Sequence, residues 1–451
     1  MTQLPEAFLA QLKFDFPEIA NKVVEGINSS APTSIQVNRR KLPELNLPNI
    51  NWNNLGYYLK DRPAFVSDPL YHAGCYYPME ASSMFVGKVI ENILSDNQNP
   101  LVLDLCAAPG GKSISILNRL NGRGFIVANE IHAQRSNILK ENLIKWGHPN
   151  ILITNNSPED FLDNPALFDV VMVDAPCSGE GMFRKDEIAI QEWSENNVSN
   201  CLVRQKNILE TAIELIKPNG YLIYSTCTFN KKENEEQVLK LLATNSFEVV
   251  KIPLDNKSEI SESNLGYRFF PGIAKGEGFA CFILKKLSSS AKKTKPQFKV
   301  KQFNIKIDWF KENQSLIFHE FKEDVFAISN FQLAKILDPK KLHIKQLGIQ
   351  VAQLKGKLLL PHPNLIFLVD LTKQISFPLI EVKIEEAHAL LCLETISVTN
   401  NPKGWIIFTY NNLPFALGKN VGNRINNYFP KNFKIRIPKN QLSNFSVSNF
   451  I

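Results

Sequence analysis

Apolar and polar positions follow two different periods between residues 101 and 285. Short apolar runs typical of buried strands alternate with stretches in which apolar residues recur every three or four positions, as in helices. The predicted strands are 101–105, 124–129, 150–154, 169–174 and 220–226, and the predicted helices are 112–120, 132–146, 198–217 and 232–243. Two further strands, 247–252 and 278–285, are expected to complete the sheet. Regular alternation of strands and helices predicts an α/β fold with a mostly parallel sheet covered by helices on both faces.

The pattern changes on either side of this core. Residues 1–25 are predicted to form one helix, Ser34–Val37 a strand, and residues 79–94 a helix that leads into the first core strand. Strand-like runs at 357–360 and 365–369 favour an α+β region, and a strand, an Asn-Asn turn and a second strand favour a β-rich module at the end. We therefore expect an N-terminal α+β appendage at 1–75, a core at 76–286, a Lys- and Ser-rich linker at 287–302, a small α+β domain at 303–382 and a β-rich module at 383–451.

Composition narrows the class of protein. A hydrophobic content of 44% is ordinary for a soluble protein, and the beginning of the chain mixes charged and apolar residues, so we expect neither a signal peptide nor a membrane span. Seven cysteines without a C-x-x-C pair argue against a disulfide framework and a zinc ribbon, so no metal is expected. These features favour a cytoplasmic location.

Charge is unevenly distributed. The net charge is +7, and from Thr395 to Ile451 there are seven Lys or Arg residues and no acid. This imbalance indicates a polyanionic partner, with a merely solvated basic face as the alternative.

The chemistry starts at Leu101–Ser113, LVLDLCAAPGGKS, which is predicted to be a strand, a Gly-rich turn and the start of a helix. Gly110 and Gly111 let a ligand approach the backbone, and the helix that begins near Lys112 offers unpaired N–H groups. Two cofactors suit such a turn, a nucleoside triphosphate and S-adenosylmethionine.

ATP is an alternative because the turn nearly matches the sequence of a phosphate-binding loop. The pattern G-x-x-x-x-G-K-S is met except at its first position, where Cys106 stands, and the strand that ends at Asp174 could hold a metal ion. Against it, Pro109 removes an amide from a loop that binds phosphate with amides, and Glu130 ends the next strand, where it suits a ribose.

Two more stretches deliver cysteines to the same region. DVVMVDAPCSGEGMFRKD ends a strand at Asp174 and continues to Cys177, and GYLIYSTCTFNKKENEEQV ends a strand at Cys227. Because parallel strands share one carboxyl edge, these side chains should converge with Asp104 and Glu130. A lone cysteine is usually an inert buried residue, but two at strand ends beside a cofactor turn favour catalysis.

The motifs CAAPGGKS, VDAPCSGEG and YSTCTFNKKENE closely resemble those of the bacterial Sun-type RNA cytosine-5 methyltransferases. The continuation EGMFRKD is similar to the ribosomal small-subunit methyltransferase F branch, and LGKNVGNRINNYFP resembles its PUA-type RNA-binding module. The resemblance implies a Rossmann-like class I methyltransferase core with S-adenosylmethionine as cofactor. It implies that the cofactor is bound by Cys106, Ala107, Ala108, Pro109, Gly110, Gly111, Lys112, Glu130 and Asp174. Arg135 also matches a basic position of the family, whereas residues 154–158 lack the acid that often receives the adenine.

The resemblance further implies covalent catalysis. A thiolate attacks carbon 6 of cytosine so that carbon 5 can take the methyl group, with Asp174 near ring nitrogen 3. A Pro-Cys pair is the nucleophile of the DNA enzymes and would select Cys177, whereas the RNA family uses the cysteine of Thr-Cys, which selects Cys227. We expect Cys227 to attack and Cys177 to assist release, with a thiol pKa lowered by Arg184, Lys185 or the cofactor.

The expected function is therefore methylation of RNA, with small-subunit ribosomal RNA as the implied substrate, no DNA or membrane partner, and a monomeric chain. The alternatives are a tRNA cytosine-5 methyltransferase, an ATP-binding RNA factor, and a catalytically silent RNA-binding protein.

Overall fold

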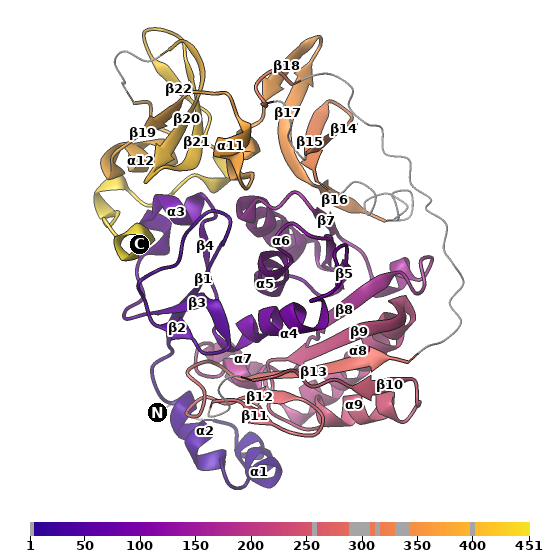
Figure 1. Ribbon diagram of the computed structural model, residues 1–451. Coiled ribbons are helices and arrows are strands. Elements are labelled where there is room, and N and C mark those ends of the chain that lie inside the picture. The colour runs from indigo at the N-terminus through magenta and orange to yellow at the C-terminus, as the bar shows by residue number, and fades with distance from the viewer. Residues whose placement is uncertain (1–3, 255–258, 288–306, 312–315, 330–341, 397–401) are drawn as a thin grey trace.

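A ten-stranded sheet forms the centre of the molecule (Figure 1). The computed structural model describes residues 4–254, 259–287, 307–311, 316–329, 342–396 and 402–451. The strand order is β11-β12-β13-β9-β8-β5-β6-β7-β16, with β10 paired to β13. The parallel strands are β5 (Leu101–Asp104), β6 (Phe125–Asn129), β7 (Ile151–Thr154), β8 (Phe168–Asp174) and β9 (Ile216–Thr226). The antiparallel additions are β10 (Phe247–Val249), β11 (Ser261–Glu262), β12 (Tyr267–Phe269), β13 (Phe279–Lys286) and β16 (Ile344–Leu347).

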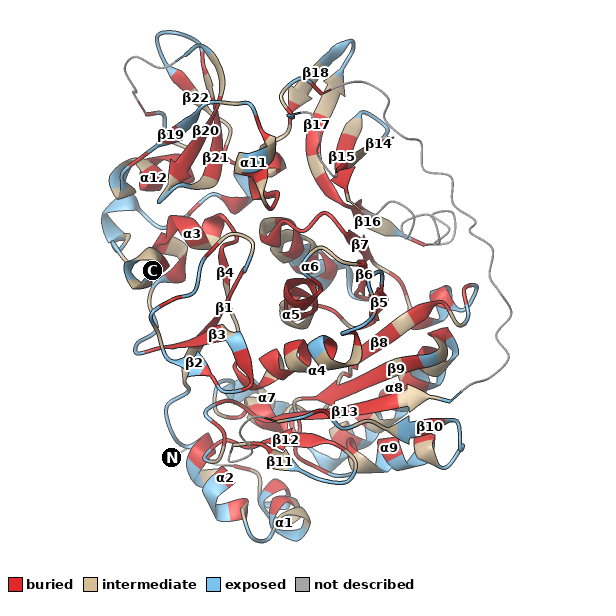
Figure 2. Ribbon diagram, in the orientation of Figure 1, coloured by how far each residue is buried: buried red, intermediate tan, exposed pale blue. Residues whose placement is uncertain are grey.

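Helices cover both faces of this sheet, as the alternation predicted. The first strand shows why, because Val102 belongs to one apolar cluster while its neighbours Leu101 and Leu103 belong to another. The Val102 cluster includes side chains of α4 (Phe85–Ile93), α5 (Gly111–Leu120) and α6 (Ala133–Trp146). The opposite cluster includes α8 (Glu195–Leu215) and α9 (Glu235–Leu242). The core strands are buried along nearly their whole length (Figure 2).

The prediction of one helix over residues 1–25 is wrong. Two helices, α1 (Glu6–Asp15) and α2 (Ala20–Ile27), are separated by a turn at Pro17, whose ring and missing N–H do not fit a helix interior. A four-stranded antiparallel sheet follows, in the order β2-β3-β1-β4. Its strands are β1 (Thr33–Val37), β2 (Asn49–Ile50), β3 (Asn53–Leu59) and β4 (Tyr76–Pro78), so the predicted strand at Ser34–Val37 is confirmed.

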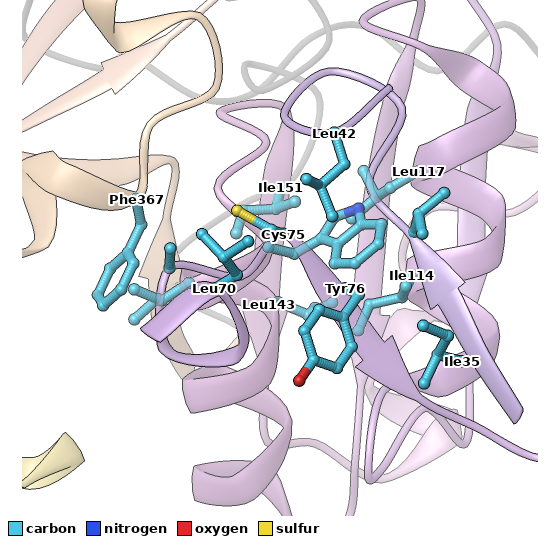
Figure 3. Close-up of a cluster of buried hydrophobic side chains, with 14 of the residues drawn as sticks. Ile35, Leu42, Leu70, Cys75, Tyr76, Ile114, Leu117, Leu143, Ile151 and Phe367 are labelled. Atoms are coloured by element: carbon cyan, nitrogen blue, oxygen red, sulfur yellow. The ribbon is translucent and has the colours of Figure 1, made fainter. Parts of the chain in front are cut away.

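This N-terminal sheet shares its apolar core with the central domain. Ile35, Cys75 and Tyr76 pack in the same cluster as Ile114 of α5 and Leu143 of α6 (Figure 3). The appendage therefore packs against α5 and α6 and shares one apolar core with them.

The residues after the core form two more four-stranded sheets. The first contains β14 (Ile317–Phe321), β15 (Asp324–Ile328), β17 (Ile349–Lys355) and β18 (Leu358–Pro361), and the intervening β16 joins the edge of the central sheet beside β7. The predicted strand-like run at 365–369 is wrong, because Pro363 and the capping side chain of His362 start a 3₁₀ helix, η5 (Pro363–Phe367). The predicted linker lies largely outside the described residues.

The last sheet contains β19 (Leu379–Glu381), β20 (Gly404–Tyr410), β21 (Leu413–Asn420) and β22 (Ile425–Asn427). Asn411 and Asn412 have φ angles of 49° and 61°, so the predicted Asn-Asn turn between two strands is confirmed. The remaining α-helices are α3 (Pro69–His72), α7 (Glu187–Glu192), α11 (Leu371–Gln374) and α12 (Ile384–Leu391). The other 3₁₀ helices are η1 (Phe65–Ser67), η2 (Ser82–Met84), η3 (Pro158–Phe161), η4 (Glu180–Met182), η6 (Lys431–Phe433), η7 (Lys439–Gln441) and η8 (Val447–Phe450).

The end of the chain returns to the N-terminal appendage, where it lies beside α3 (Figure 1). The buried carboxylate of Asp68 accepts hydrogen bonds from Ser446 Oγ at 2.9 Å and from the Val447 amide at 2.8 Å. It also accepts from the Leu70 amide and the Tyr76 hydroxyl, each at 3.0 Å. One carboxylate thus joins the N-terminal appendage to residues near position 447.

We predict that Asp68→Ala lowers the free energy of unfolding by about 3 kcal/mol, because it leaves buried donors without an acceptor. Urea denaturation measures the change, and limited proteolysis should show earlier cleavage near the C-terminal end. The exposed Asp96→Ala is the matched control and should change stability by no more than about 0.5 kcal/mol. An unchanged unfolding midpoint for Asp68→Ala would contradict the role given to this carboxylate.

Candidate active site

The carboxyl ends of β8 and β9 meet at Asp174. The register of the two strands sets Asp174 opposite Ser225, whose hydroxyl donates to Asp174 Oδ1 at 2.7 Å. Lys112, in the first turn of α5, donates from Nζ to Asp174 Oδ2 at 2.7 Å. The sequence predicted the convergence of these strand ends, but it did not predict that Lys112 pairs with Asp174.

The two predicted thiols are in contact. Cys177 lies in the loop after β8 and Cys227 directly after β9, and their sulfur atoms are 3.3 Å apart. The hydrogen bond to Cys227, together with burial, raises the pKa of Cys177 well above its ordinary value. The loops after β8 and β9 therefore bring both sulfur atoms to one place.

The expectation that Arg184 or Lys185 lowers a thiol pKa is not met by this geometry. Arg184 Nε is 2.8 Å and Lys185 Nζ is 3.1 Å from the carboxylate of Glu277, so both cations are engaged by one buried acid. The cation that interacts electrostatically with Cys227 is Lys112. Burial by itself lowers the pKa of Lys112, but Asp174, Cys227 and Asp104 outweigh burial and leave the pKa raised.

The Gly-rich turn is held by α6. Gly110 has a φ of 115°, a conformation that favours glycine, and it precedes the first residue of α5. Arg135 donates to the Ala108 carbonyl at 2.8 Å, and Asn142 donates to the Pro109 carbonyl at 2.9 Å. Ala107 and Ala108 are buried and Cys106 is partly exposed. The turn is therefore fixed by side chains of the neighbouring helix.

Glu130 lies just past β6, where its side chain is almost fully buried. Its carboxylate accepts from the His132 amide at 2.9 Å, and Arg135 is 3.7 Å away. Glu130 and the Gly-rich turn thus flank the carboxyl edge of the same two parallel strands, β5 and β6, as the sequence predicted.

Sequence reasoning missed a group of buried polar side chains in the two loops that carry the thiols. Glu180, Asn230 and Glu233 are at most 2% exposed and connect the loops that follow β8 and β9. The stretch KKENEEQ gave no signal of this, because acids in such a polar stretch are usually exposed, whereas Glu233 is buried. Within the parts of the chain that the structure describes, no cluster of side chains has the make-up of a metal site.

The central domain has the Rossmann-like fold of solved methyltransferases. A methyltransferase homologue from Pyrococcus horikoshii has a TM-score of 0.54 at 24% identity, with 63% of this chain and 95% of that chain covered. NSun6 from the same organism, solved with SFG, has a TM-score of 0.55 at 18% identity, with 64% and 100% covered. These likenesses establish the fold class that the sequence predicted.

The family follows from the sequence matches. Residues 91–285 match the model described as 16S rRNA methyltransferase RsmB/F, residues 4–81 the N-terminal domain of RsmF, and residues 377–435 the RsmF PUA domain. The chain belongs to the RsmB/F family of methyltransferases. Ribosomal RNA small subunit methyltransferase F of Salmonella agona is 29% identical, with 95% of this chain and 96% of that protein covered. The protein of the same name from Salmonella arizonae is 28% identical over the same shares. The predicted family resemblance is thereby confirmed.

The electrostatics of the site predict a pH effect on stability. Burial raises the pKa of Asp104 to about 7, the hydrogen bond from Ser113 opposes this rise, and Asp174 adds to it. A raised carboxyl pKa means that stability is highest when Asp104 is protonated and is lost as the pH rises from about 4 to 7.

We predict that Asp104→Asn reduces this loss. Between pH 5 and 8 the free energy of unfolding of the variant should fall by about 2–3 kcal/mol less than that of the original chain. Urea denaturation at a series of pH values measures the difference, and measurements near pH 4, where the original carboxyl is protonated, provide the control. If the stability of the two proteins changed with pH in the same way, burial would not raise the pKa of the Asp104 carboxyl.

Proposed function

We propose that this protein transfers a methyl group from S-adenosylmethionine to carbon 5 of a cytidine in small-subunit ribosomal RNA. The observation that carries the proposal is the pair of sulfur atoms at 3.3 Å, placed at the strand ends beside Asp174 and Lys112. Family membership supports the methyltransferase reaction, and relatives named for small-subunit ribosomal RNA favour that substrate over tRNA.

The residues around the turn fit S-adenosylmethionine. Asp104 Oδ1 and Asn156 Oδ1 are buried acceptors with no hydrogen-bond partner among the described residues, so a bound ligand could supply their donors. Glu130 offers a carboxylate to ribose hydroxyls, and the N-terminal turn of α5 suits the carboxylate of the methionine part. The cofactor supplies an electrophilic methyl group. Cys106, Ala107, Ala108, Pro109, Gly110, Gly111, Lys112, Glu130 and Asp174 would bind it.

The thiols supply the covalent step. Cys227 attacks carbon 6 of cytosine, a bond forms between sulfur and carbon 6, and the electron pair of the carbon 5–carbon 6 bond makes carbon 5 nucleophilic. Lys112 places a positive charge beside this thiolate, and a proton shared between Asp174 and ring nitrogen 3 would stabilise the charge that develops on the ring. After methyl transfer a base removes the proton from carbon 5, the carbon 5–carbon 6 double bond returns, and the sulfur leaves as thiolate.

Cys177 is placed to assist this last step. Its sulfur lies 3.3 Å from Cys227, so it can donate a proton to the departing thiolate and favour release of the RNA. The target cytidine must leave its stack to reach this edge.

The other domains support an RNA substrate. The stretch after residue 395 carries seven basic residues and no acid, and a PUA-type module covers 377–435. No helix within the described ranges has the length and apolar character of a membrane span. We propose a monomer that acts in the cytoplasm. Of the expected divisions at 1–75, 76–286, 287–302, 303–382 and 383–451, the first is moved past β4, which belongs to the N-terminal sheet, and the fourth contributes β16 to the central sheet.

We predict that Glu130→Ala weakens S-adenosylmethionine binding by about 1.5–3 kcal/mol, because hydrogen bonds to a charged acceptor are lost. Isothermal calorimetry measures the affinity, and the exposed Glu159→Ala serves as the control. ATP should give no comparable heat. Tight ATP binding without S-adenosylmethionine binding would refute the proposed reaction.

We predict opposite effects for the two cysteine variants. Cys227→Ala cannot form the covalent bond, so methylation should be abolished while RNA and cofactor still bind. In the Cys177→Ala variant, Cys227 should still attack and the base should still be methylated, but the RNA should be released slowly. A denaturing gel should therefore show a protein band shifted by bound RNA.

The double variant Cys177→Ala/Cys227→Ala controls for non-covalent binding and should show no shifted band. A shifted band in Cys227→Ala alone would exchange the roles of the two thiols.

A further inference from the structure

The two thiol loops are tied to each other by three buried side chains. Glu180 belongs to the loop after β8, whereas Asn230 and Glu233 belong to the loop after β9. Their exposures are 1%, 2% and 0%. We call Glu180, Asn230 and Glu233 the cross-loop clamp.

Glu180 reaches from the Cys177 loop to the backbone of the Cys227 loop. Its Oε2 accepts the amides of Phe229 at 2.8 Å and Asn230 at 2.9 Å. Its Oε1 accepts the Trp193 indole N–H at 3.1 Å. The carboxylate therefore fixes the backbone two and three residues after Cys227.

Glu233 makes the reciprocal connection. Its Oε1 accepts the Ser178 amide at 3.0 Å and the Gln205 amide group at 2.8 Å, and its Oε2 is 2.5 Å from Ser178 Oγ. Because Ser178 directly follows Cys177, this carboxylate fixes the backbone next to the second thiol.

Asn230 joins the two acids. A side-chain amide has two N–H donors, and Nδ2 lies 3.0 Å from Glu180 Oε1 and 2.6 Å from Glu233 Oε2. Its Oδ1 accepts the Glu233 amide at 2.9 Å. Burial raises the pKa of Glu233, the hydrogen bonds from Ser178 and Asn230 oppose this rise, and Glu180 adds to it. The neutral Asn230 amide thus donates to both buried carboxyl groups and lies between them.

We propose that the cross-loop clamp sets the distance between Cys177 and Cys227, with Asn230 as the positioning residue that couples the two loops. This rests on the proposed function, in which Cys227 attacks the cytosine and Cys177 assists its release. Each loop is held by a carboxylate of the other, so a change in one loop moves both sulfur atoms. The clamp thereby keeps Cys177 within reach of the Cys227 sulfur when the RNA is released.

The test measures the thiol distance without RNA or cofactor. The full-length reduced protein is treated with diamide, an azo oxidant that takes two electrons and two protons from a thiol pair as the S–S bond forms. Mass spectrometry then follows the Cys177–Cys227 disulfide. Asn230→Ala should slow its formation by about tenfold or more, since small displacements strongly reduce the effective concentration of reacting groups.

A second variant guards against a failure of Asn230→Ala to fold. Glu233→Gln keeps the volume and can still accept from Ser178 and Gln205, but it sets an N–H group against Asn230 Nδ2, so it should also slow the disulfide. Asn118→Ala is the matched control, because Asn118 is equally buried and its hydrogen bonds run to Val37 and Arg39. It should form the disulfide at the original rate.

A catalytic readout completes the test. In Asn230→Ala and Glu233→Gln, kcat for methylation should fall while KM for S-adenosylmethionine stays the same. Equal disulfide rates in all variants, with only stability reduced, would overturn the clamp. Absence of methylation by the original protein would instead overturn the proposed function, so the two failures are distinguishable.

Discussion

The pairing of β8 with β9 is the constraint on which the site depends. Backbone hydrogen bonds fix Asp174 opposite Ser225, and this register brings the next residues of both strands to one edge. A shift by one residue would turn Asp174 to the other face of the sheet and separate it from Lys112. The register between β8 and β9 therefore decides whether an acid, an amine and two thiols lie close together.

Burial makes this arrangement costly and explains its many hydrogen bonds. Asp104, Glu180 and Glu233 are buried ionisable groups and Lys112 is partly buried, and most of their partners come from distant parts of the chain. An isolated buried charge is strongly destabilising, whereas a fully hydrogen-bonded one is tolerated. The hydrogen bonds to Glu180 and Glu233 thus offset the cost of burying these two carboxyl groups.

Much of the fold could be predicted because its signals are local. The core strands are continuous apolar runs and the helices have regular apolar spacing, so their positions differ from the structure by only a few residues. The convergence of Asp174, Cys177 and Cys227 followed from the shared edge of parallel strands. Contacts between distant residues could not be predicted in this way. The pair of Lys112 with Asp174, the engagement of Arg184 by Glu277 and the addition of β16 to the sheet leave no periodic pattern in the sequence.

The contact between Asp68 and Val447 also has a consequence for synthesis. The two residues are 379 positions apart, so the Val447 amide is made long after the carboxylate that it contacts. At about 5–20 residues per second, roughly 20–75 s pass before the C-terminal residues exist. Until then the Asp68 carboxylate lacks two of its four hydrogen-bond donors, those of Ser446 and Val447. The contacts of Asp68 with Ser446 and Val447 therefore form only after the central sheet has been synthesised.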